Sequence, residues 1–442
     1  MGKIVIVGGG WAGCAAAIRA RKQGHRVVLL EKTDLLLGLG NVGGIMRNNG
    51  RFTAAEENIS MGSGELFQIT DRLSTHRNVD FPGHKHASFY DTAMVEPEVR
   101  RLLCSLGIEL KMMTRAIDVR LEKTGHDKRR ILRSVLAVAP DKNRAAGIDG
   151  LCHIEIEGDA FVETTGSTGP MGNCVRYGNG CSMCILRCPA FGPRVSLTEK
   201  AGNDDLAAER ADGRLGAFSG SCKLEKRTLS EELQERLDED GFAVVALPAE
   251  MVHKEKLSQK VCQQYALDMF AENVILIDTG FAKMMSPYFS LEELRKVPGF
   301  ENVRFADPYA GGKGNSIRYM AVGLRDCFMR AEKIENLFLG GEKSGFFVGH
   351  TEAITTGSLA GYNGARYCSG KELLRLPVET ACGDLLETAE QALYEENATA
   401  RRFTFAGGEY FERMKEKGLY LTDPCMIRQR VRRVGLENVY GS

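Results

Sequence analysis

The sequence lacks both an excess of charge of one sign and any long hydrophobic run. Its 442 residues hold 58 Lys and Arg against 58 Asp and Glu, so there is no global field to attract nucleic acid or a membrane. No apolar stretch approaches the roughly 20 residues that a membrane-spanning helix needs. The sequence also enters its first predicted strand at once, which leaves no room for a signal peptide. We therefore expect a cytoplasmic protein that makes no membrane contact.

Cysteine, by contrast, is plentiful, with 13 residues. In a chain with no export signal, so many thiols favour reduced cysteines, metal ligands or redox chemistry over a disulfide scaffold. The length of 442 residues exceeds what one simple core supports and predicts two or three domains. Hydrophobic residues make up 43% and charged residues 26%, as is usual for globular proteins.

The N-terminal stretch has the pattern of a strand, a glycine-rich turn, a helix and a second strand. Four β-branched residues, 4–7, predict a strand buried on both faces. The glycines that follow have the spacing G-x-G-x-x-G, and the alanine-rich residues 14–23 predict a helix. A second apolar strand, 27–30, ends on Glu31. This order predicts a site for an adenine dinucleotide, the alternative being a glycine-rich turn with no ligand.

Each residue of the motif has a physical role. Gly8 permits the tight turn, Gly10 lets the backbone approach a pyrophosphate, and Gly13 allows the helix to pack closely on the strand. The phosphate charge would lie at the N-terminus of the helix. Glu31 is placed to accept hydrogen bonds from a ribose hydroxyl, and Lys32 beside it is predicted to belong to the same site.

A second group of glycines follows, at positions 38, 40, 43 and 44. Glycine lets backbone amides approach a second phosphate or a flat ring without steric conflict. Since the group follows a dinucleotide motif, we interpret Gly43 and Gly44 as cofactor-binding residues, the alternative being a flexible loop.

The next part of the chain predicts a helix, several strands and a turn. The expected elements are a helix at 96–106, strands at 108–113 and 116–121, and a weakly alternating antiparallel meander at 131–138 and 154–161. The last strand runs into FVETTGSTG, whose small residues around Gly166 can bring the chain back beside the dinucleotide.

This order of elements resembles the two-dinucleotide-binding-domain flavoproteins, the glutathione-reductase-like FAD fold. The resemblance implies that FAD is the cofactor, that the turn ending at Gly166 returns to it, and that the backbone near Ala116 contacts the adenine edge. The implied fold class is α/β, with a Rossmann FAD-binding domain, an inserted substrate domain and a small C-terminal helical region.

Four cysteines gather in the middle of the chain with the spacing C-x6-C-x2-C-x3-C-P, namely Cys174, Cys181, Cys184 and Cys188. Their last part resembles a ferredoxin run, so the four could ligate a 4Fe-4S cluster. Alternatively, Cys181 and Cys184 alone form a catalytic redox dithiol. The third interpretation is a structural zinc site or a group of buried free thiols. Cys222 is an alternative fourth ligand or a resolving thiol.

The segment after the cysteines alternates between helix and strand, which suggests a substrate-side domain. The pattern predicts a solvated helix at 229–240 with Ser230 as its N-cap, a strand at 242–247, an amphipathic helix at 257–271 and a strand at 274–278.

Near residue 337 the sequence predicts a return to the cofactor. A strand at 337–339, a turn containing Gly341 and Glu342, and a helix from Thr351 to 367 follow one another. A helix beginning at Thr351 presents free N–H groups and the positive end of its dipole. In the FAD fold that it resembles, this terminus faces the flavin.

The stretch 336–366 and the LRLPVETACGDLLE that follows resemble the tRNA-modifying flavoproteins. These are the folate-dependent tRNA uridine methyltransferases and the flavoproteins that install carboxymethylaminomethyl on the wobble uridine. Glu342 replaces the Gln usual in that motif. The tail from 401 to 433 is locally basic, and its arginines 428, 430, 432 and 433 could meet an RNA backbone or form a solvated helix face paired with acids.

From these patterns we expect four segments: 1–166 and 306–368 as two parts of an FAD-binding domain, 167–305 as a cysteine-rich insertion, and 369–442 as a helical region. The function expected is an FAD-dependent oxidoreductase that exchanges electrons between flavin and the cysteines, with a small-molecule or protein redox partner. The alternatives are a flavin- and folate-dependent tRNA uridine methyltransferase, in which tRNA is a partner, and a non-catalytic electron-transfer subunit of a larger complex.

Overall fold

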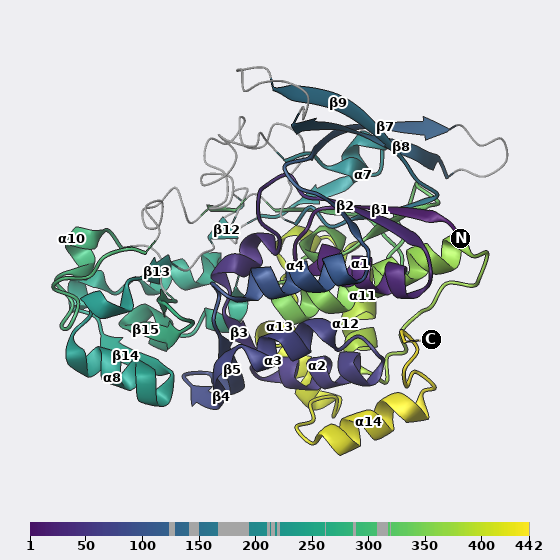
Figure 1. The fold of residues 1–442 in the computed structure, drawn as a ribbon. Helices are drawn as coiled ribbons and strands as arrows, with labels where there is room; N and C mark the ends of the chain where they lie inside the picture. The colour runs from purple at the N-terminus through teal and green to yellow at the C-terminus, as the bar shows by residue number, and fades with distance from the viewer. Residues whose placement is uncertain are drawn as a thin grey trace.

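The computed structural model describes residues 1–122, 129–140, 150–166, 194–209, 213, 217–218, 222–260, 262–285, 289–306, 317–318 and 320–441. A parallel five-stranded sheet with the strand order β19-β10-β1-β2-β6 lies at the centre (Figure 1). Its strands are Lys3–Val7 (β1), Arg26–Leu30 (β2), Glu109–Lys111 (β6), Ala160–Glu163 (β10) and Leu337–Leu339 (β19). The sheet therefore joins segments that are more than 300 residues apart in the sequence.

The two faces of this sheet are covered by different layers. Ile4 and Ile6 of β1 belong to the core formed with helices α1 (Trp11–Lys22) and α11 (His350–Cys368). Val5 and Val7 belong to a separate core on the other face. Because neighbouring strand residues point to opposite faces, both faces of β1 are apolar, as its β-branched sequence predicts.

The second face is covered by an antiparallel meander (Figure 1). Its strands are Arg115–Glu122 (β7), Ile131–Pro140 (β8) and Leu151–Glu157 (β9). The predicted meander is confirmed, but the predicted strand at 154–161 is in fact two strands. Its first part ends β9, and its last part begins β10 in the parallel sheet.

The segment after β2 forms a helical layer and a small sheet. Its helices are Gly50–Ser60 (α2), Glu65–Arg72 (α3) and Val95–Ser105 (α4), and its strands are Ile45–Met46 (β3), Ser74–Phe81 (β4) and His84–Tyr90 (β5). Helix α4 confirms the predicted helix at 96–106, and Val99 and Leu103 on its inner face are buried.

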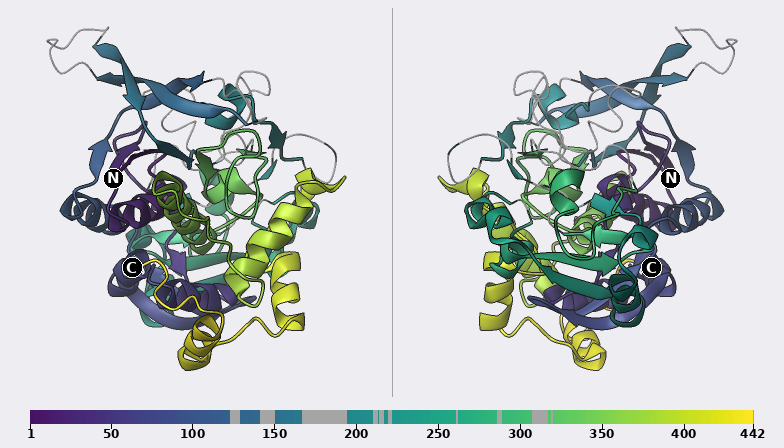
Figure 2. Two further views of the ribbon diagram at one scale, coloured as in Figure 1. Left: turned by 90° about the vertical axis from the view of Figure 1, so that its right-hand side faces the viewer. Right: turned by 90° about the vertical axis from the view of Figure 1, so that its left-hand side faces the viewer.

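A four-stranded antiparallel sheet, ordered β13-β16-β15-β14, forms a lobe beside the central sheet, seen in teal in Figures 1 and 2. Its elements are Cys222–Leu224 (β13), Glu231–Asp240 (α8), Phe242–Ala246 (β14), Asn273–Asp278 (β15), Ala282–Met284 (β16) and Leu291–Leu294 (α10). The predicted cap of α8 is confirmed, since the Ser230 hydroxyl accepts a hydrogen bond from the Leu233 N–H.

The predicted helix at 257–271 is wrong. This stretch forms short turns, Lys254–Gln259 (η4) and Gln263–Tyr265 (η5), and one brief helix, Met269–Glu272 (α9). The His84 ring and the Lys260 ammonium bond the carbonyl oxygens of Gln264 and Tyr265. A continuous helix would use those same carbonyls for its own hydrogen bonds.

The C-terminal region is helical, as predicted, and packs against α2 (Figures 1 and 2). It comprises Ala381–Ala392 (α12), Gly408–Glu416 (α13) and Pro424–Arg433 (α14). The remaining short elements include Gly38–Val42 (η1), Leu197–Lys200 (α7), Asp205–Ala207 (β11), Ala217–Phe218 (β12), Lys226–Thr228 (η2), Ala249–Met251 (η3), Ile317–Arg318 (β17), Ala321–Gly323 (β18), Gly341–Ser344 (η7) and Ala398–Ala400 (η8).

Helices α1 and α11 approach each other closely because small residues line their contact. A Cβ atom at Gly361 would overlap the carbonyl oxygen of Ala16, and one at Gly357 would overlap that of Ala12. Glycine at these two positions lets α11 lie directly against α1, although glycine inside a helix is intrinsically unfavourable.

We expect Gly361→Ala to lower the free energy of unfolding by about 2 kcal/mol, because the added methyl group forces the two helices apart. Gly364→Ala in the same helix is the matched control, since its Cβ would meet ordinary contacts, the nearest being Phe338 Cδ2 at 3.7 Å. The control should be neutral or stabilising by up to about 1 kcal/mol. Urea denaturation measures both, and equal effects of the two substitutions would refute the close-packing argument.

Candidate functional site

The turn between β1 and α1 has two crowded glycines and one open glycine. Gly8 has φ +105°, and a Cβ there would overlap the carbonyl of Thr164. A Cβ at Gly13 would overlap the carbonyl oxygen of Gly8. At Gly10 no atom of the described residues lies within 4 Å of the position that a Cβ would take. Gly8 and Gly13 are thus required by packing, whereas Gly10 leaves space on the outer side of the turn.

The carboxylate of Glu31 lies against this turn. Its Oε2 accepts a hydrogen bond from the Gly9 N–H at 2.8 Å, and its Oε1 accepts from the N–H and hydroxyl of Thr33 at 2.8 and 2.9 Å. The side chain is buried, and a carboxylate offers about four lone-pair sites. Glu31 is therefore held in place and keeps capacity for a further donor. Lys32, which follows it, is half-buried.

The turn after β10 returns to the glycine motif. The Thr164 N–H donates to the Val7 carbonyl at 2.8 Å, and its hydroxyl donates to the Gly8 carbonyl at 2.7 Å. Gly166 has φ +70° and, like Gly10, no atom of a described residue within 4 Å of its Cβ position. The structure thus brings the turn at Gly166 to the motif at Gly8. Ala116 is buried in the core between the sheet and the meander.

The Gly43–Gly44 loop packs between α11 and the antiparallel lobe. A Cβ at Gly43 would overlap the imidazole ring of His350, and one at Gly44, where φ is +82°, would overlap the side chain of Thr279. The ammonium of Lys283, on β16, donates a hydrogen bond to the Gly43 carbonyl. The loop predicted to approach the cofactor therefore lies where three parts of the chain meet.

The predicted residues of the second FAD segment lie at the start of α11 and beside α1. Gly341, with φ +67°, donates its N–H to the Thr356 hydroxyl at 2.8 Å, and a Cβ there would lie 2.9 Å from the Ala12 methyl. Glu342 is half-buried in the same turn, and Thr351 is buried in the first turn of α11.

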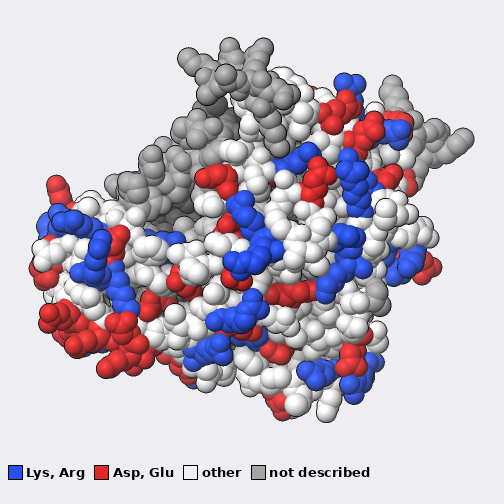
Figure 3. Space-filling model, viewed as in Figure 1, with Lys and Arg blue, Asp and Glu red and all other residues white. Residues whose placement is uncertain are grey.

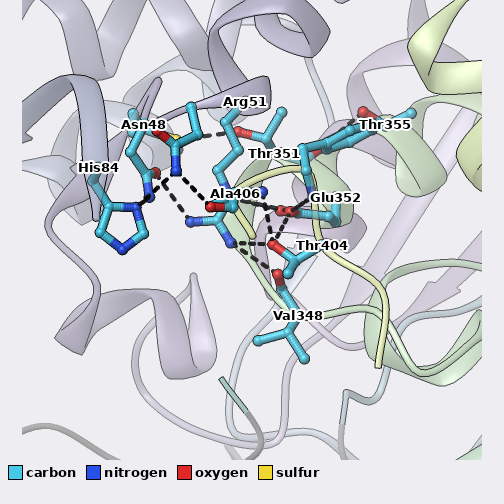
Figure 4. Close-up of polar contacts among 12 residues, drawn as sticks. Asn48, Arg51, His84, Val348, Thr351, Glu352, Thr355, Thr404 and Ala406 are labelled. Atoms are coloured by element: carbon cyan, nitrogen blue, oxygen red, sulfur yellow. Dashed lines mark hydrogen bonds and ion pairs between the residues drawn. The ribbon is translucent and has the colours of Figure 1, made fainter. Parts of the chain in front are cut away.

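Sequence reasoning missed an ion pair that holds the start of α11 (Figure 4). Arg51 Nε lies 3.1 Å from both carboxylate oxygens of Glu352, and both side chains are almost fully buried. The same guanidinium donates to the Val348 carbonyl at 2.8 Å and to the Thr404 hydroxyl at 3.1 Å. Burial acts to lower the pKa of Arg51, but the Glu352 carboxylate outweighs it and the pKa is raised. No local signal in the sequence links residues 300 positions apart.

Three aromatic or imidazole groups near this pair were also missed. The His350 ring lies 5.6 Å from the Trp11 ring, centroid to centroid, and its Nδ1 lies 3.4 Å from the Tyr90 hydroxyl. Burial, with the charges of Arg51 and Lys283, lowers the pKa of His350 to about 3. The ring is therefore neutral at physiological pH. Trp11 is buried, and its Nε1 has no hydrogen-bond partner among the described residues.

The predicted cysteine site lies outside the described residues, since 167–193 contain all four of Cys174, Cys181, Cys184 and Cys188. Within the part of the chain that the structure describes, no group of three or more His, Cys, Asp or Glu side chains could hold a metal ion. That same part contains no helix with the length and apolar character needed to cross a bilayer.

The parallel sheet, the glycine turn backed by an acid and the returning strand define a Rossmann-type dinucleotide-binding fold, as predicted. Residues 3–285 and 271–372 match the family model of glucose inhibited division protein A. The chain belongs to this family. The predicted membership of the FAD-dependent oxidoreductases related to tRNA-modifying flavoenzymes is thereby confirmed, as is the class of FAD-dependent enzyme.

Individual relatives and one solved structure are also similar to this chain. The chain is 36% identical over 93 residues to methylenetetrahydrofolate–tRNA-(uracil-5-)-methyltransferase TrmFO of Caldicellulosiruptor bescii, a match that spans only 21% of either chain. It is 21% identical over 463 residues to TrmFO of Geobacter sp. strain M21, covering 98% of this chain and 95% of the relative. The structure of Aquifex aeolicus GidA matches 98% of this chain and 76% of its own, with a TM-score of 0.62 and 16% identity, which confirms the fold.

We expect Glu352→Gln to lower the free energy of unfolding by about 3 kcal/mol, because it leaves the buried Arg51 charge uncompensated. In the double variant Arg51→Gln/Glu352→Gln no buried charge remains, so at least half of this loss should be recovered. Guanidinium unfolding of the wild type, of each single variant, Arg51→Gln and Glu352→Gln, and of the double variant measures the coupling. Additive losses would show that the two groups do not depend on each other.

Proposed function

We propose that the chain is an FAD-dependent enzyme that modifies uridine in tRNA. The observation that carries this proposal is the family membership, together with an alignment over 98% of the chain to a relative named as a tRNA (uracil-5-)-methyltransferase. These findings favour the tRNA-modifying alternative over electron exchange with the cysteine array.

The residues present fit the adenine half of FAD. Gly10 and Gly166 follow the carboxyl ends of β1 and β10, and neither has a described atom within 4 Å of its Cβ position, so a bulky side chain at either would take space that a pyrophosphate needs. Glu31 would accept a hydrogen bond from a ribose hydroxyl, and the first N–H groups of α1 would meet the phosphate charge. The orphaned N–H of the buried Trp11 is a further donor that a bound group could satisfy.

The flavin end would lie near the Gly43–Gly44 loop, Gly341 and Thr351. FAD, when bound, would supply the hydride and electron chemistry that amino acid side chains lack. At this end the Arg51–Glu352 pair fixes the first turn of α11, and His350, whose pKa is lowered to about 3, stays neutral beside it. These residues hold the geometry of the site without contributing redox chemistry of their own.

The charge distribution restricts where a polyanion such as tRNA could dock. The exposed face of α8 carries only one basic residue, Arg236, among six acids: Glu231, Glu232, Glu235, Asp238, Glu239 and Asp240. Figure 3 shows these acids gathered at the lower left of the molecule. In α14, Arg428, Arg432 and Arg433 are exposed, although Arg432 Nε bonds Glu437 at 2.7 Å. Phosphate contacts are expected at the C-terminal helices and not at α8.

One tail arginine has a structural role in place of the RNA contact considered above. Arg430 is buried, and its guanidinium lies 2.8 Å from Glu57 Oε1. Glu57 also accepts the N–H groups of Ala381 and Cys382, both at 2.9 Å. The pair therefore ties α14 to α2 and to the N-terminus of α12.

The 4Fe-4S cluster and the redox dithiol remain predictions about residues 167–193, and neither the family nor the described residues supply support for a cluster. Iron analysis of protein purified without oxygen tests the cluster, and counting the free thiols before and after reduction tests the dithiol.

The decisive substitution is Gly10→Val. Since no atom in the part of the chain that the structure describes lies within 4 Å of its Cβ position, the variant should fold with an unchanged thermal midpoint, but the side chain would occupy the space proposed for the pyrophosphate. We expect FAD content, measured from the absorbance of protein-free extract, to fall at least tenfold. Gly364→Ala, whose Cβ would meet only ordinary contacts, is the control and should keep wild-type FAD content.

The same proteins test the reaction. Wild-type protein, FAD, methylenetetrahydrofolate and a reductant are incubated with unmodified tRNA, and the nucleosides are analysed by mass spectrometry. Conversion of uridine by the wild type, and none by Gly10→Val, is the expected result. The assay is repeated with an amine donor in place of the folate. An FAD-loaded wild type that leaves every uridine unchanged with both donors would contradict the proposal.

A further inference from the structure

Lys283 is a buried cation with an unusual environment. It lies on β16 in the antiparallel lobe, its side chain is buried, and its ammonium donates to the carbonyl of Gly43. No described carboxylate forms an ion pair with it. Arg51, the other buried cation nearby, is balanced by Glu352.

The surroundings of Lys283 oppose its charge. Burial, the largest cause, and the charges of Lys223 and Arg51 together lower its pKa to about 7, while the Cys262 thiol acts in the opposite direction. A buried ammonium without an anionic partner is costly, and a side chain such as Met would fill the same space without that cost. A cation kept in this position suggests that an anion balances it in the working protein.

The loop that Lys283 contacts is the one that faces the start of α11. Gly43 is in contact with His350, the first residue of this 19-residue helix, whose N-terminal N–H groups carry positive potential. The Trp11 ring lies against His350, and its N–H has no described partner. Lys283, the helix start and the indole N–H therefore approach one region from three different segments.

We propose that the Lys283 ammonium balances the negative charge that the isoalloxazine ring of FAD gains on reduction. This inference rests on the proposed FAD site. A hydride donor transfers two electrons and one proton to the ring, which thereby gains one negative charge. Lys283 keeps its protons and forms no bond to the ring, so its contribution is electrostatic.

The test compares Lys283→Met with Lys283→Arg and Lys223→Met in FAD-loaded protein. Lys223 is the matched control, because it lies directly opposite Lys283 in the β13–β16 pair and its ammonium contacts the Phe281 ring, 5.0 Å from the centroid. Two readouts need no tRNA. They are the two-electron potential of the flavin and its affinity for sulfite, which adds to the oxidised ring and leaves it negatively charged.

Lys283→Met should weaken sulfite binding at least tenfold and lower the potential by about 30 mV, the equivalent of tenfold in a two-electron equilibrium. Lys283→Arg should stay within threefold of the wild type and Lys223→Met within twofold. Wild-type values in Lys283→Met would overturn the inference.

Stability separates a charge role from a structural one. As an electrostatic group, Lys283 can be replaced by Met with an unchanged or higher thermal midpoint of the FAD-free protein. If both Lys283→Met and Lys283→Arg lose FAD and stability, the residue is structural and the inference fails. If the wild type itself binds no FAD, the proposed function fails instead.

Discussion

The structure depends on the direct contact of α1 with α11, two helices that come from opposite ends of the chain. Gly357 and Gly361 let α11 lie against the backbone of Ala12 and Ala16. This contact places the start of α11 near the glycine turn that opens α1, so that residues near 10 and near 350 lie beside each other. The Arg51–Glu352 pair then fixes the first turn of α11, and the Gly43–Gly44 loop packs between that turn and the antiparallel lobe. Without the close helix contact, the two halves of the predicted cofactor site would not meet.

The sequence was sufficient to predict those elements whose structure depends on residues close to one another in the chain. The β1–α1–β2 unit, the cap at Ser230 and the helix that begins near Thr351 follow from spacing, caps and apolar patterns within a few residues. The turn at Thr164 was also recognised, because small residues after a buried strand allow only a limited set of paths.

Features formed between distant segments could not be predicted. The turns at 254–265 replace a predicted helix because the side chains of His84 and Lys260 bond the carbonyls of Gln264 and Tyr265. Arg430 was considered a surface residue because its partner, Glu57, lies more than 370 positions earlier. Likewise, nothing in the sequence near Lys283 or Arg51 indicates that both are buried at one boundary.

The claim on which the account rests is that the β1–α1 turn and Glu31 bind the ADP half of FAD. Calorimetric titration of the cofactor-free protein with FAD and with FMN, which lacks the AMP part of that half, tests it directly. The account predicts one FAD per chain and an affinity for FMN that is at least a hundredfold weaker. Equal affinities for the two flavins, or no binding of either, would contradict it.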